Sequence, residues 1–289
     1  MAKKHNYLNN KDMLLEIHRS KTSYCDFIDP KYSDYHIILE DPTTIDTSGS
    51  YKKQLLDEEN KNIAKQNKAS TLAQKNYKNA VQQYSGPANK KPKLAQFKID
   101  PESIPDDEIV YRVTTYTHIP AEPGRKKTPK RIQDTKVKLN FIPYKHYIIK
   151  NGKPVEVGRS HYNNGAFCLT HGAITDTLAN MFMLLVERYS QKANWRGYSY
   201  LEEMKGQSLL QLSFIALQFN EAKSANPFAY YTAILTNSFR RVLNIEKRAQ
   251  HIKDDIMIQH GQNPSFSRQI EYEEQIRKMR EEIQNKNNE

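Results

Sequence analysis

The spacing of hydrophobic residues changes several times along the chain, and each change predicts a different kind of segment. Residues 7–18 carry a small apolar face behind two asparagines that suit an N-cap, so we expect a short helix there. Residues 20–50 are rich in Pro, Ser and Thr, which favours a loop, with one short strand at 36–39 as the alternative. Residues 51–84 are polar with a thin apolar stripe, which predicts an exposed helix or a partner-binding arm. The four prolines of 86–108 favour a linker.

Further along, the pattern becomes that of β-strands. Residues 109–116 are β-branched and aromatic, and residues 137–142 alternate between apolar and polar side chains. Residues 147–157 read as a hairpin that turns at Asn151-Gly152, a sequence that suits a type I′ turn. A small antiparallel sheet is therefore expected in this region.

A helical period dominates the rest of the chain. We expect a first helix over 166–190, a second over 199–219, and a third that begins after Asn226-Pro227 and runs to about residue 258. A charged helix follows over 267–289. The predicted fold is mainly α: a helical bundle with a small antiparallel β insert and extended polar segments. The residues expected on the buried faces of the first two helices are Ile174, Leu178, Met181, Phe182, Leu185, Val186, Leu209, Leu212, Phe214, Ile215 and Leu217.

Composition narrows the class of partner. The chain carries 44 Lys and Arg against 33 Asp and Glu, which favours a polyanion such as nucleic acid over an anionic membrane, although a merely soluble basic protein would look the same. The longest apolar run, near 181–186, is too short to span a membrane. The two cysteines do not form a disulfide framework or a zinc motif, and no signal peptide is evident, which fits a reducing cytoplasm.

Motifs for catalysis or cofactor binding are not found. The sequence contains no phosphate loop, no dinucleotide-binding glycine turn and no nucleophile elbow, so we expect no cofactor, no metal and no enzymatic activity. The acidic run Asp106-Asp107-Glu108 is the one candidate for a metal, with a solvated loop as the ordinary alternative.

The third helix combines aromatic and basic residues. Aromatic side chains at 228–239 precede arginines and lysines at 240–248. Aromatic rings stack on unpaired bases and cations contact phosphates, so this order suits a helix that captures opened DNA. A core helix that ends in cations favourable to its dipole explains the same pattern equally well. The residues concerned are Phe228, Tyr230, Tyr231, Phe239, Arg240, Arg241, Lys247 and Arg248.

Several short stretches resemble a known family. The stretches are Asn6–Lys11, Asn194–Tyr198, Glu202–Met204, Leu209–Phe219, Asn226–Tyr231 and Phe239–Val242. In this order and spacing they resemble the second conserved region of sigma factors, and they are most similar to the late-transcription sigma factors of T-even-like bacteriophages. The resemblance covers residues 5–18 and 166–258. It implies a protein that directs core RNA polymerase to late promoters, in the cytoplasm of an infected bacterium.

The resemblance also implies roles for individual residues. The polymerase-binding residues would be Glu202, Glu203, Gln207, Leu210 and Phe214, which would dock on the clamp helices of the largest subunit. The residues that contact promoter DNA at a −10-like element would be Trp195, Tyr230, Tyr231, Asn237, Arg240, Arg241, Lys247 and Arg248. A phage co-activator or a sliding clamp is a further partner that the family implies. The implied divisions are an N-terminal helix at 1–20 that packs on the sigma bundle, a polar helix and linker insert at 21–108, a small basic β insert at 109–165, the sigma-like helical domain at 166–260 and a charged C-terminal helix or tail at 261–289.

The chain departs from the family pattern in four respects. Ile234-Leu235 stands where cellular sigma factors have two tryptophans, the C-terminal end does not match the clamp-binding tail, and no helix-turn-helix for a −35 element is evident. Residues of about 20–165 also exceed what the smallest members of the phage family carry. The insert is itself basic between Arg125 and Lys153. We therefore hypothesise that Lys126, Lys127, Lys130 and Arg131 contact promoter DNA, with a solvated loop as the alternative.

Two other functions remain open from the sequence. A general nucleic-acid-binding adaptor would bind DNA without polymerase. A nuclease would cleave DNA with a metal held by Asp106 and Asp107. Binding to core polymerase separates the sigma function from both.

Overall fold

The computed structural model describes residues 8–39, 51–86, 91–120 and 139–287, and the chain divides into two compact units. Unit 1 comprises Met1–Met181 and Phe214–Phe228. Unit 2 comprises Phe182–Ser213 and Ala229–Glu289. The fold is mainly α, as predicted. It also contains a small mixed sheet, which belongs to unit 1.

A five-stranded sheet forms the centre of unit 1, in the order β1-β5-β4-β3-β2. Neighbouring strands are antiparallel except β2 and β3, which run parallel, so the expectation of an antiparallel sheet is wrong at this edge. A parallel pair needs a long crossover, and the helices α2 (Tyr51–Leu55) and α3 (Glu58–Gln83) lie between these two strands in the sequence. The strands are β1 (Cys25–Phe27), β2 (Ile37–Leu39), β3 (Tyr111–Thr114), β4 (Tyr144–Lys150) and β5 (Lys153–Ser160).

The central hairpin confirms the turn that the sequence predicts. Strands β4 and β5 pair in antiparallel register, with Lys150 opposite Lys153. Asn151 and Gly152 both have positive φ, 52° and 70°, which a type I′ turn requires at its two central positions. The hairpin is the most locally encoded part of the sheet.

The outer strands depart from the prediction. The strand at 36–39 is confirmed as β2, but β1 lies in a segment expected to be a loop. The strand predicted at 137–142 is wrong where it can be tested: residues 137 and 138 lie outside the described residues, and residues 139–142 form no strand. Their alternation instead reflects burial, because Leu139 and Phe141 are both buried.

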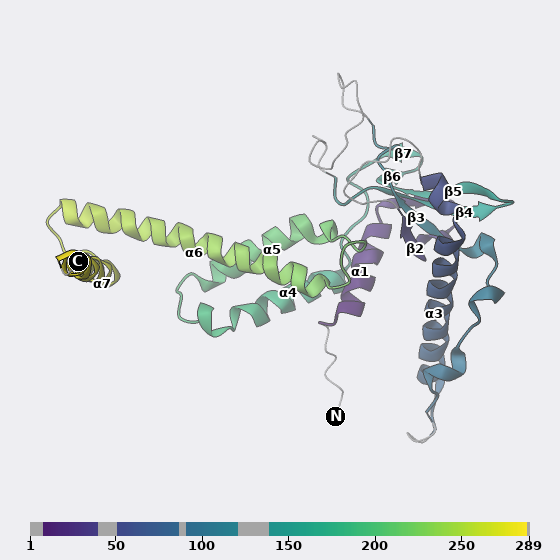
Figure 1. Ribbon diagram of the computed structural model, residues 1–289, viewed down its shortest axis with the longest axis horizontal. Coiled ribbons are helices and arrows are strands. Elements are labelled where there is room, and N and C mark those ends of the chain that lie inside the picture. Colours follow the sequence, from purple (N-terminus) through teal and green to yellow (C-terminus); the bar gives the residue numbers. More distant parts are fainter. Residues whose placement is uncertain (1–7, 40–50, 87–90, 121–138, 288–289) are drawn as a thin grey trace. The chain divides into compact units, whose positions relative to one another are not determined.

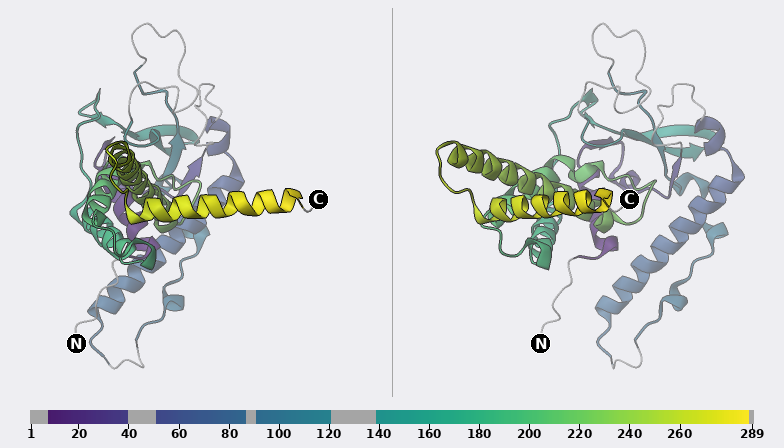
Figure 2. Two further views of the ribbon diagram at one scale, coloured as in Figure 1. Left: turned by 90° about the vertical axis from the view of Figure 1, so that its left-hand side faces the viewer. Right: turned by 60° about the vertical axis from the view of Figure 1, so that its left-hand side comes forward.

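The polar helix predicted at 51–84 is confirmed as α2 (Tyr51–Leu55) and α3 (Glu58–Gln83). Ala64 and Ala69 of α3 belong to one hydrophobic cluster with Leu55 of α2. Ile109, just before β3, and Tyr111, at the start of β3, belong to the same cluster. After α3 the chain returns alongside the helix, which can be followed in both figures (Figures 1 and 2). Over its described part, the predicted linker at 86–108 is therefore an irregular segment with short 3-10 turns that runs back along α3.

The acidic run at 106–108 is held by lysines of α3. Asp106 accepts Nζ of Lys61 at 2.6 Å and Nζ of Lys65 at 2.9 Å, and Glu108 pairs with Lys68. These hydrogen bonds and charges lower the pKa of Asp106 below its usual value, the contact with Lys61 contributing most. The acidic residues 106–108 therefore attach the irregular segment after α3 to that helix. Within the described part of the chain, no group of three or more His, Cys, Asp or Glu could hold a metal ion.

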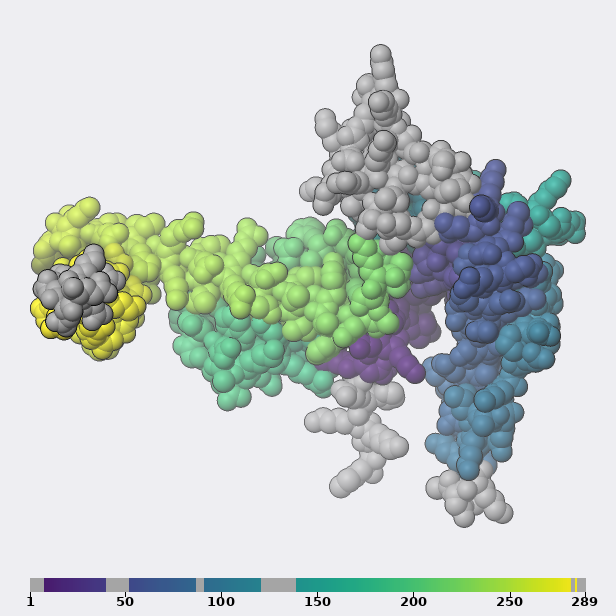
Figure 3. Space-filling model, viewed as in Figure 1, coloured from purple at the N-terminus to yellow at the C-terminus, as the bar shows by residue number. Residues whose placement is uncertain are grey.

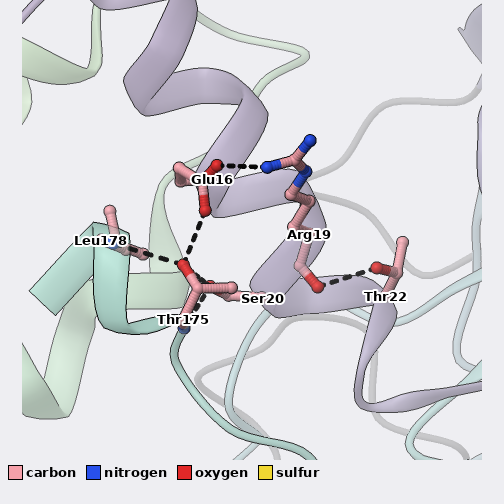
Figure 4. Close-up of polar contacts among 6 residues, drawn as sticks. All are labelled: Glu16, Arg19, Ser20, Thr22, Thr175 and Leu178. Carbon is pink, nitrogen blue, oxygen red and sulfur yellow. Dashed lines mark hydrogen bonds and ion pairs between the residues drawn. The ribbon is translucent and has the colours of Figure 1, made fainter.

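The N-terminal helix, predicted at 7–18, is α1 (Asn10–Thr22), with the side chain of Asn9 capping it by accepting the Asp12 N–H at 2.8 Å. Its inner face bonds to Thr175, the residue that precedes α4 (Asp176–Ser190) (Figure 4). Thr175 Oγ1 accepts the Leu178 N–H at 3.3 Å as an N-cap and donates to Glu16 at 2.8 Å, while Ser20 accepts the Thr175 N–H at 3.1 Å.

This cap corrects the predicted start of the first long helix. The prediction placed that helix at 166–190, whereas α4 is Asp176–Ser190 and Ala166–Phe167 forms strand β7 against β6 (Tyr162–Asn163). Gly172, with φ 78°, breaks any helix before Thr175. The apolar Ile174 therefore lies ahead of the helix, and its burial face begins with Leu178 and Met181 as predicted.

A buried cluster of charges joins α1 to the segment 214–228 within unit 1. Nζ of Lys21 lies 2.6 Å from a carboxylate oxygen of Glu221 and donates to the carbonyl of Phe219 at 2.7 Å. Beside this pair, the guanidinium of Arg112 lies between the rings of Tyr35 and Tyr144, at 3.7 and 3.9 Å from their centroids. The cluster was not predicted from the sequence.

Arg112 forms no ion pair with a carboxylate among the described residues and is instead bonded to two histidines whose pKa burial lowers. Its Nε donates to Nε2 of His146 at 3.0 Å, and a terminal nitrogen lies 3.3 Å from Nδ1 of His18. The other ring nitrogen of His146 lies 2.7 Å from the carbonyl of Tyr32, so it donates and leaves Nε2 free to accept. Burial lowers the pKa of His146 well below its usual value, which keeps that ring an acceptor.

Unit 2 is helical. It takes in α4 from Phe182 onward, most of α5 (Leu201–Ile215), most of α6 (Pro227–Gln259) and all of α7 (Phe266–Asn287). The second, third and C-terminal helices predicted from the sequence are thus confirmed, with the last residues of the second forming a 3-10 turn at Ala216–Gln218. None of the helices in the described residues is long and apolar enough to cross a membrane.

Candidate nucleic-acid interface

An aromatic cluster in unit 2 fixes the rotation of α6 about its axis. The ring of Tyr231 meets Phe182 edge-on at 4.8 Å, and the ring of Phe239 meets Tyr189 at 5.1 Å and Trp195 at 5.2 Å. These rings form the centre of a packed interior. One face of α6 is therefore held inward, and the opposite face is held outward.

This cluster corrects two of the expected DNA contacts. Tyr231 is completely buried and Trp195 is only 8% exposed, so neither ring can stack on a base without unpacking the core. Helical spacing alone could have shown that Tyr231 faces inward. Tyr231, Leu235 and Val242 lie on one face of α6, and all three are buried. Leu235 is one of the two residues that stand where cellular sigma factors have tryptophans, and it is also a core residue.

The outward face of α6 carries most of the remaining predicted residues. Asn237, Arg240, Arg241 and Arg248 are exposed and line one shallow groove of about 370 Å³ together with Asn244 and Ile245. Tyr230 precedes Asn237 by seven residues and therefore lies on the same face, half-buried and edge-on to Tyr231. Lys247 is exposed but does not line the groove. The residues that the sequence singled out for DNA thus separate into an outward set and a buried set.

The arginines of this groove are not used by ion pairs within unit 2. Among the described residues of that unit, the ion pairs join Lys205 to Glu187 and Glu202, Arg268 to Asp255 and Glu271, and Arg277 to Glu281. Arg240, Arg241 and Arg248 are left to face solvent. Guanidinium groups bind phosphate oxygens through two parallel N–H donors, so a row of them is suited to a sugar-phosphate backbone.

The dimensions and chemistry of the groove fit a short length of nucleic acid. From Asn237 to Arg248 the helix rises about 16 Å, the length of roughly five nucleotide steps along one strand of a duplex. The amides of Asn237 and Asn244 add groups that can both donate to and accept from base edges. The arrangement can bind and orient a polyanion, and it contains no carboxylate or histidine that could act as an acid or base.

The predicted polymerase-binding residues form an exposed face of α5. Glu203, Gln207 and Leu210 recur at helical spacing, and Phe214 follows at the next position of that face. Leu210 is 51% exposed and Phe214 is 69% exposed, which is high for large apolar side chains. The prediction that Phe214 belongs to the buried face of this helix is therefore wrong, whereas Met204, Ser208 and Leu212 are buried.

Glu202 lies beside that face and has an internal partner. Its carboxylate is 2.7 Å from Nζ of Lys205, which also lies 3.2 Å from Glu187. The side chain of Glu202 is nevertheless 83% exposed, so this pair leaves the carboxylate accessible. The face therefore combines acidic residues at one end with apolar residues at the other.

The remaining predicted contacts lie elsewhere. Lys126, Lys127, Lys130 and Arg131, proposed for the basic insert, lie outside the described residues. Comparisons with protein-family models, with curated proteins and with solved structures found no match. The exposed faces of α5 and α6 are therefore the features on which a function can be argued.

Proposed function

We propose that this chain is a non-catalytic transcription factor of the sigma type that binds core RNA polymerase and directs it to promoter DNA. The observation that carries the proposal is the groove of α6, where three arginines that take part in no ion pair among the described residues of unit 2 accompany two asparagines. An aromatic core on the other side of the helix holds this groove outward, which is the preorganisation that a binding surface needs.

In this proposal, α6 contacts the promoter. Arg240, Arg241 and Arg248 bind phosphates, and Asn237 and Asn244 contact base edges. Tyr230 is the aromatic residue of this face that is only half-buried, so it is the one that stacks on an unpaired base. Because Tyr231 and Trp195 support the core instead, capture of an opened strand depends on fewer aromatic side chains than the sequence resemblance implies.

The face of α5 supplies the contact with polymerase. Glu202 and Glu203 meet basic residues of the clamp helices, and Leu210 and Phe214 pack against apolar ones. Exposed apolar side chains rimmed by charge are typical of protein interaction sites. The DNA-binding and polymerase-binding surfaces are thus on different helices, so each can be changed separately.

Replacing Arg240 and Arg241 together by alanine is expected to weaken DNA binding at every sequence tested. The slope of log affinity against log salt is negative, and each lost phosphate contact reduces its magnitude by about 0.9. The double variant should therefore have a slope that is shallower by nearly 2. Fluorescence anisotropy with a short promoter duplex, titrated at several salt concentrations, measures both quantities. The double change of Lys52 and Lys53, which are exposed on α2, removes the same charge and should leave the slope unaltered.

Replacing Glu202 and Glu203 by lysine is expected to abolish retention of the chain on bacterial core polymerase. The changes place like charges against basic clamp helices, while the matched change of Glu273 and Glu274 on α7 reverses the same charge elsewhere. Pull-down with core polymerase, followed by run-off transcription from late promoters, provides the measurement. A wild-type chain that binds DNA but never core polymerase would support the adaptor function instead and reject the sigma proposal.

A further inference from the structure

The C-terminal half of α6 carries an apolar stripe that no described element of unit 2 covers. Ile245, Ile252 and Ile256 are 54%, 58% and 50% exposed, and Ala249 is exposed between them. Val242 is the last buried apolar residue of the helix. The C-terminal end of α6 extends past α4 and α5 (Figures 1 and 3). Ile245 also lies at the edge of the arginine groove, and the other members of the stripe continue the inward face of α6.

Helix α7 is attached to a different face of α6. Asp254 accepts the backbone N–H of Ser265 at 2.8 Å and its hydroxyl at 2.7 Å, which caps the start of α7. Arg268 contacts His251 at 3.0 Å, and Gln250 donates to Ser265 at 3.1 Å. At 100° per residue these positions lie on the side of α6 away from the isoleucines. Docking of α7 therefore leaves the stripe open.

The spacing of the stripe is that of a coiled-coil seam. Its members follow one another at intervals of four, three and four residues, the a and d positions of a heptad repeat. The flanking positions are occupied by charged side chains on both sides of the seam. Glu246 and Lys253 flank one side, and Arg248 and Asp255 flank the other.

We propose that this stripe binds the same stripe of a second copy of the chain, in antiparallel orientation. Placing Ile245 against the partner's Ile256, and Ala249 against the partner's Ile252, uses every member of the seam. A shift by one heptad in either direction would leave half of them unpaired. This register is therefore the one that buries the most apolar surface.

The flanking charges favour the same arrangement. In an antiparallel pair the flanking positions face their equivalents, so Glu246 faces the partner's Lys253 and Arg248 faces the partner's Asp255. Two-fold symmetry repeats both pairs, which gives opposite charges at all four places. In a parallel pair Arg248 would face the partner's Lys253, and the like charges would repel. Charge complementarity thus selects a second copy and sets its direction.

Arg248 and Lys253 are exposed, and Glu246 is half-buried. Glu246, Arg248 and Lys253 take part in none of the ion pairs among the described residues of unit 2. Asp255 contacts Arg268 at 3.3 Å but its side chain remains 57% exposed, so it can accept a second donor. Because the seam spans only two heptads, we expect a weak dimer that forms at high concentration or when two copies are brought together.

Sedimentation equilibrium of the full chain, without DNA, tests the proposal. The wild type should show a reversible monomer–dimer equilibrium, and Ile252→Lys should abolish it because the charge enters the seam twice per dimer. Ile258→Lys is the matched control: Ile258 is 51% exposed on the same helix but lies off the seam, so its dimer should persist. A wild type that stays monomeric up to about 1 mM overturns the proposal.

A charge reversal tests the direction. Lys253→Glu places like charges opposite each other in the antiparallel pair and should weaken the dimer about tenfold. In a parallel pair the same change would strengthen it, and that result would overturn the antiparallel arrangement. The swap Glu246→Lys with Lys253→Glu should restore the wild-type affinity. Tryptophan emission from Trp195, buried in the core of unit 2, verifies that each variant is folded.

Discussion

Lowering the pH from 7 to 5 is expected to unfold unit 1. Burial lowers the pKa of His118 and of His161 to about 3, and burial together with Lys68 lowers that of His36 to about 4. In the unfolded chain each of these rings titrates near 6.5. A pKa that is lower in the folded state stabilises the fold fully above 6.5 and progressively less as the pH falls.

The size of the effect follows from the number of histidines. Each contributes a loss of about 1.4 kcal/mol per pH unit below 6.5, and with His146 there are four rings with a strongly lowered pKa, so their total approaches roughly 5 kcal/mol per unit. Burial also lowers the pKa of His18, which acts in the same direction. Domains are stable by about 5–15 kcal/mol, so one to two pH units suffice. Nearly neutral pH should therefore be required for unit 1 to remain folded.

Two spectroscopic signals together distinguish the units. Near-ultraviolet circular dichroism reports packed tyrosines of both units, such as Tyr111 and Tyr144 of unit 1 and Tyr231 of unit 2, whereas emission of Trp195 reports unit 2 alone. We expect the tyrosine signal to decrease as the pH falls while the Trp195 emission is still unchanged. His36→Asn keeps an acceptor for the Val110 N–H and removes one titrating group, so it should move the midpoint to lower pH. A tyrosine signal that is constant between pH 7 and 5 would disprove the expectation.

Replacing Lys21 by methionine is expected to lower the free energy of unfolding by about 3–5 kcal/mol, because it leaves the carboxylate of Glu221 buried without its partner. The side chains of Lys21 and Glu221 are 5% and 12% exposed. Burial acts to raise the pKa of Glu221, but Lys21 and Arg112 lower it below the usual value, which favours the carboxylate. Burial lowers the pKa of Lys21, and Glu221 acts against that change. Urea unfolding at pH 7.5 measures the change.

Two variants make this expectation specific. Adding Glu221→Gln to Lys21→Met removes the unpaired charge and should recover a large part of the stability. Lys31→Met breaks the exposed pair with Asp29 and should change the urea midpoint little. If the double variant were no more stable than Lys21→Met, lost packing rather than the stranded charge would explain the effect.

Sequence patterns correctly predicted the helices and turns that are determined by residues close together in the chain. The Asn151-Gly152 hairpin, the start of α6 at Pro227 and the polar helix α3 each follow from turn chemistry or helical spacing within a few residues. The pairing of β2 beside β3 does not, because the two strands are separated by about 70 residues and only tertiary packing brings them together. Strand β1, three residues long, has the same origin.

The candidate site was predicted by residue type more reliably than by orientation. Aromatic and basic residues on α6 suggested nucleic acid, but the sequence does not state which rings point inward. The helical phase would have separated them, since Tyr231 lies in register with Leu235 and Val242 whereas Arg241 and Arg248 lie in register with Asn237. The buried cluster of Lys21, Arg112 and Glu221 gives no sequence signal, because charged residues are ordinarily read as surface.

The placement of core, groove and apolar stripe on one helix restricts how this chain can vary over evolution. Insertion of a single residue near Tyr231 would rotate everything after it by 100°, turning the arginines toward the interior and the core side chains toward solvent. Substitutions of Asn237, Arg240 or Arg241 alter only the groove, whereas Ile245 and Arg248 belong both to the groove and to the proposed dimer contact. We therefore expect that length changes within α6 are selected against far more strongly than changes of residue type, and that tolerated ones add or remove whole heptads.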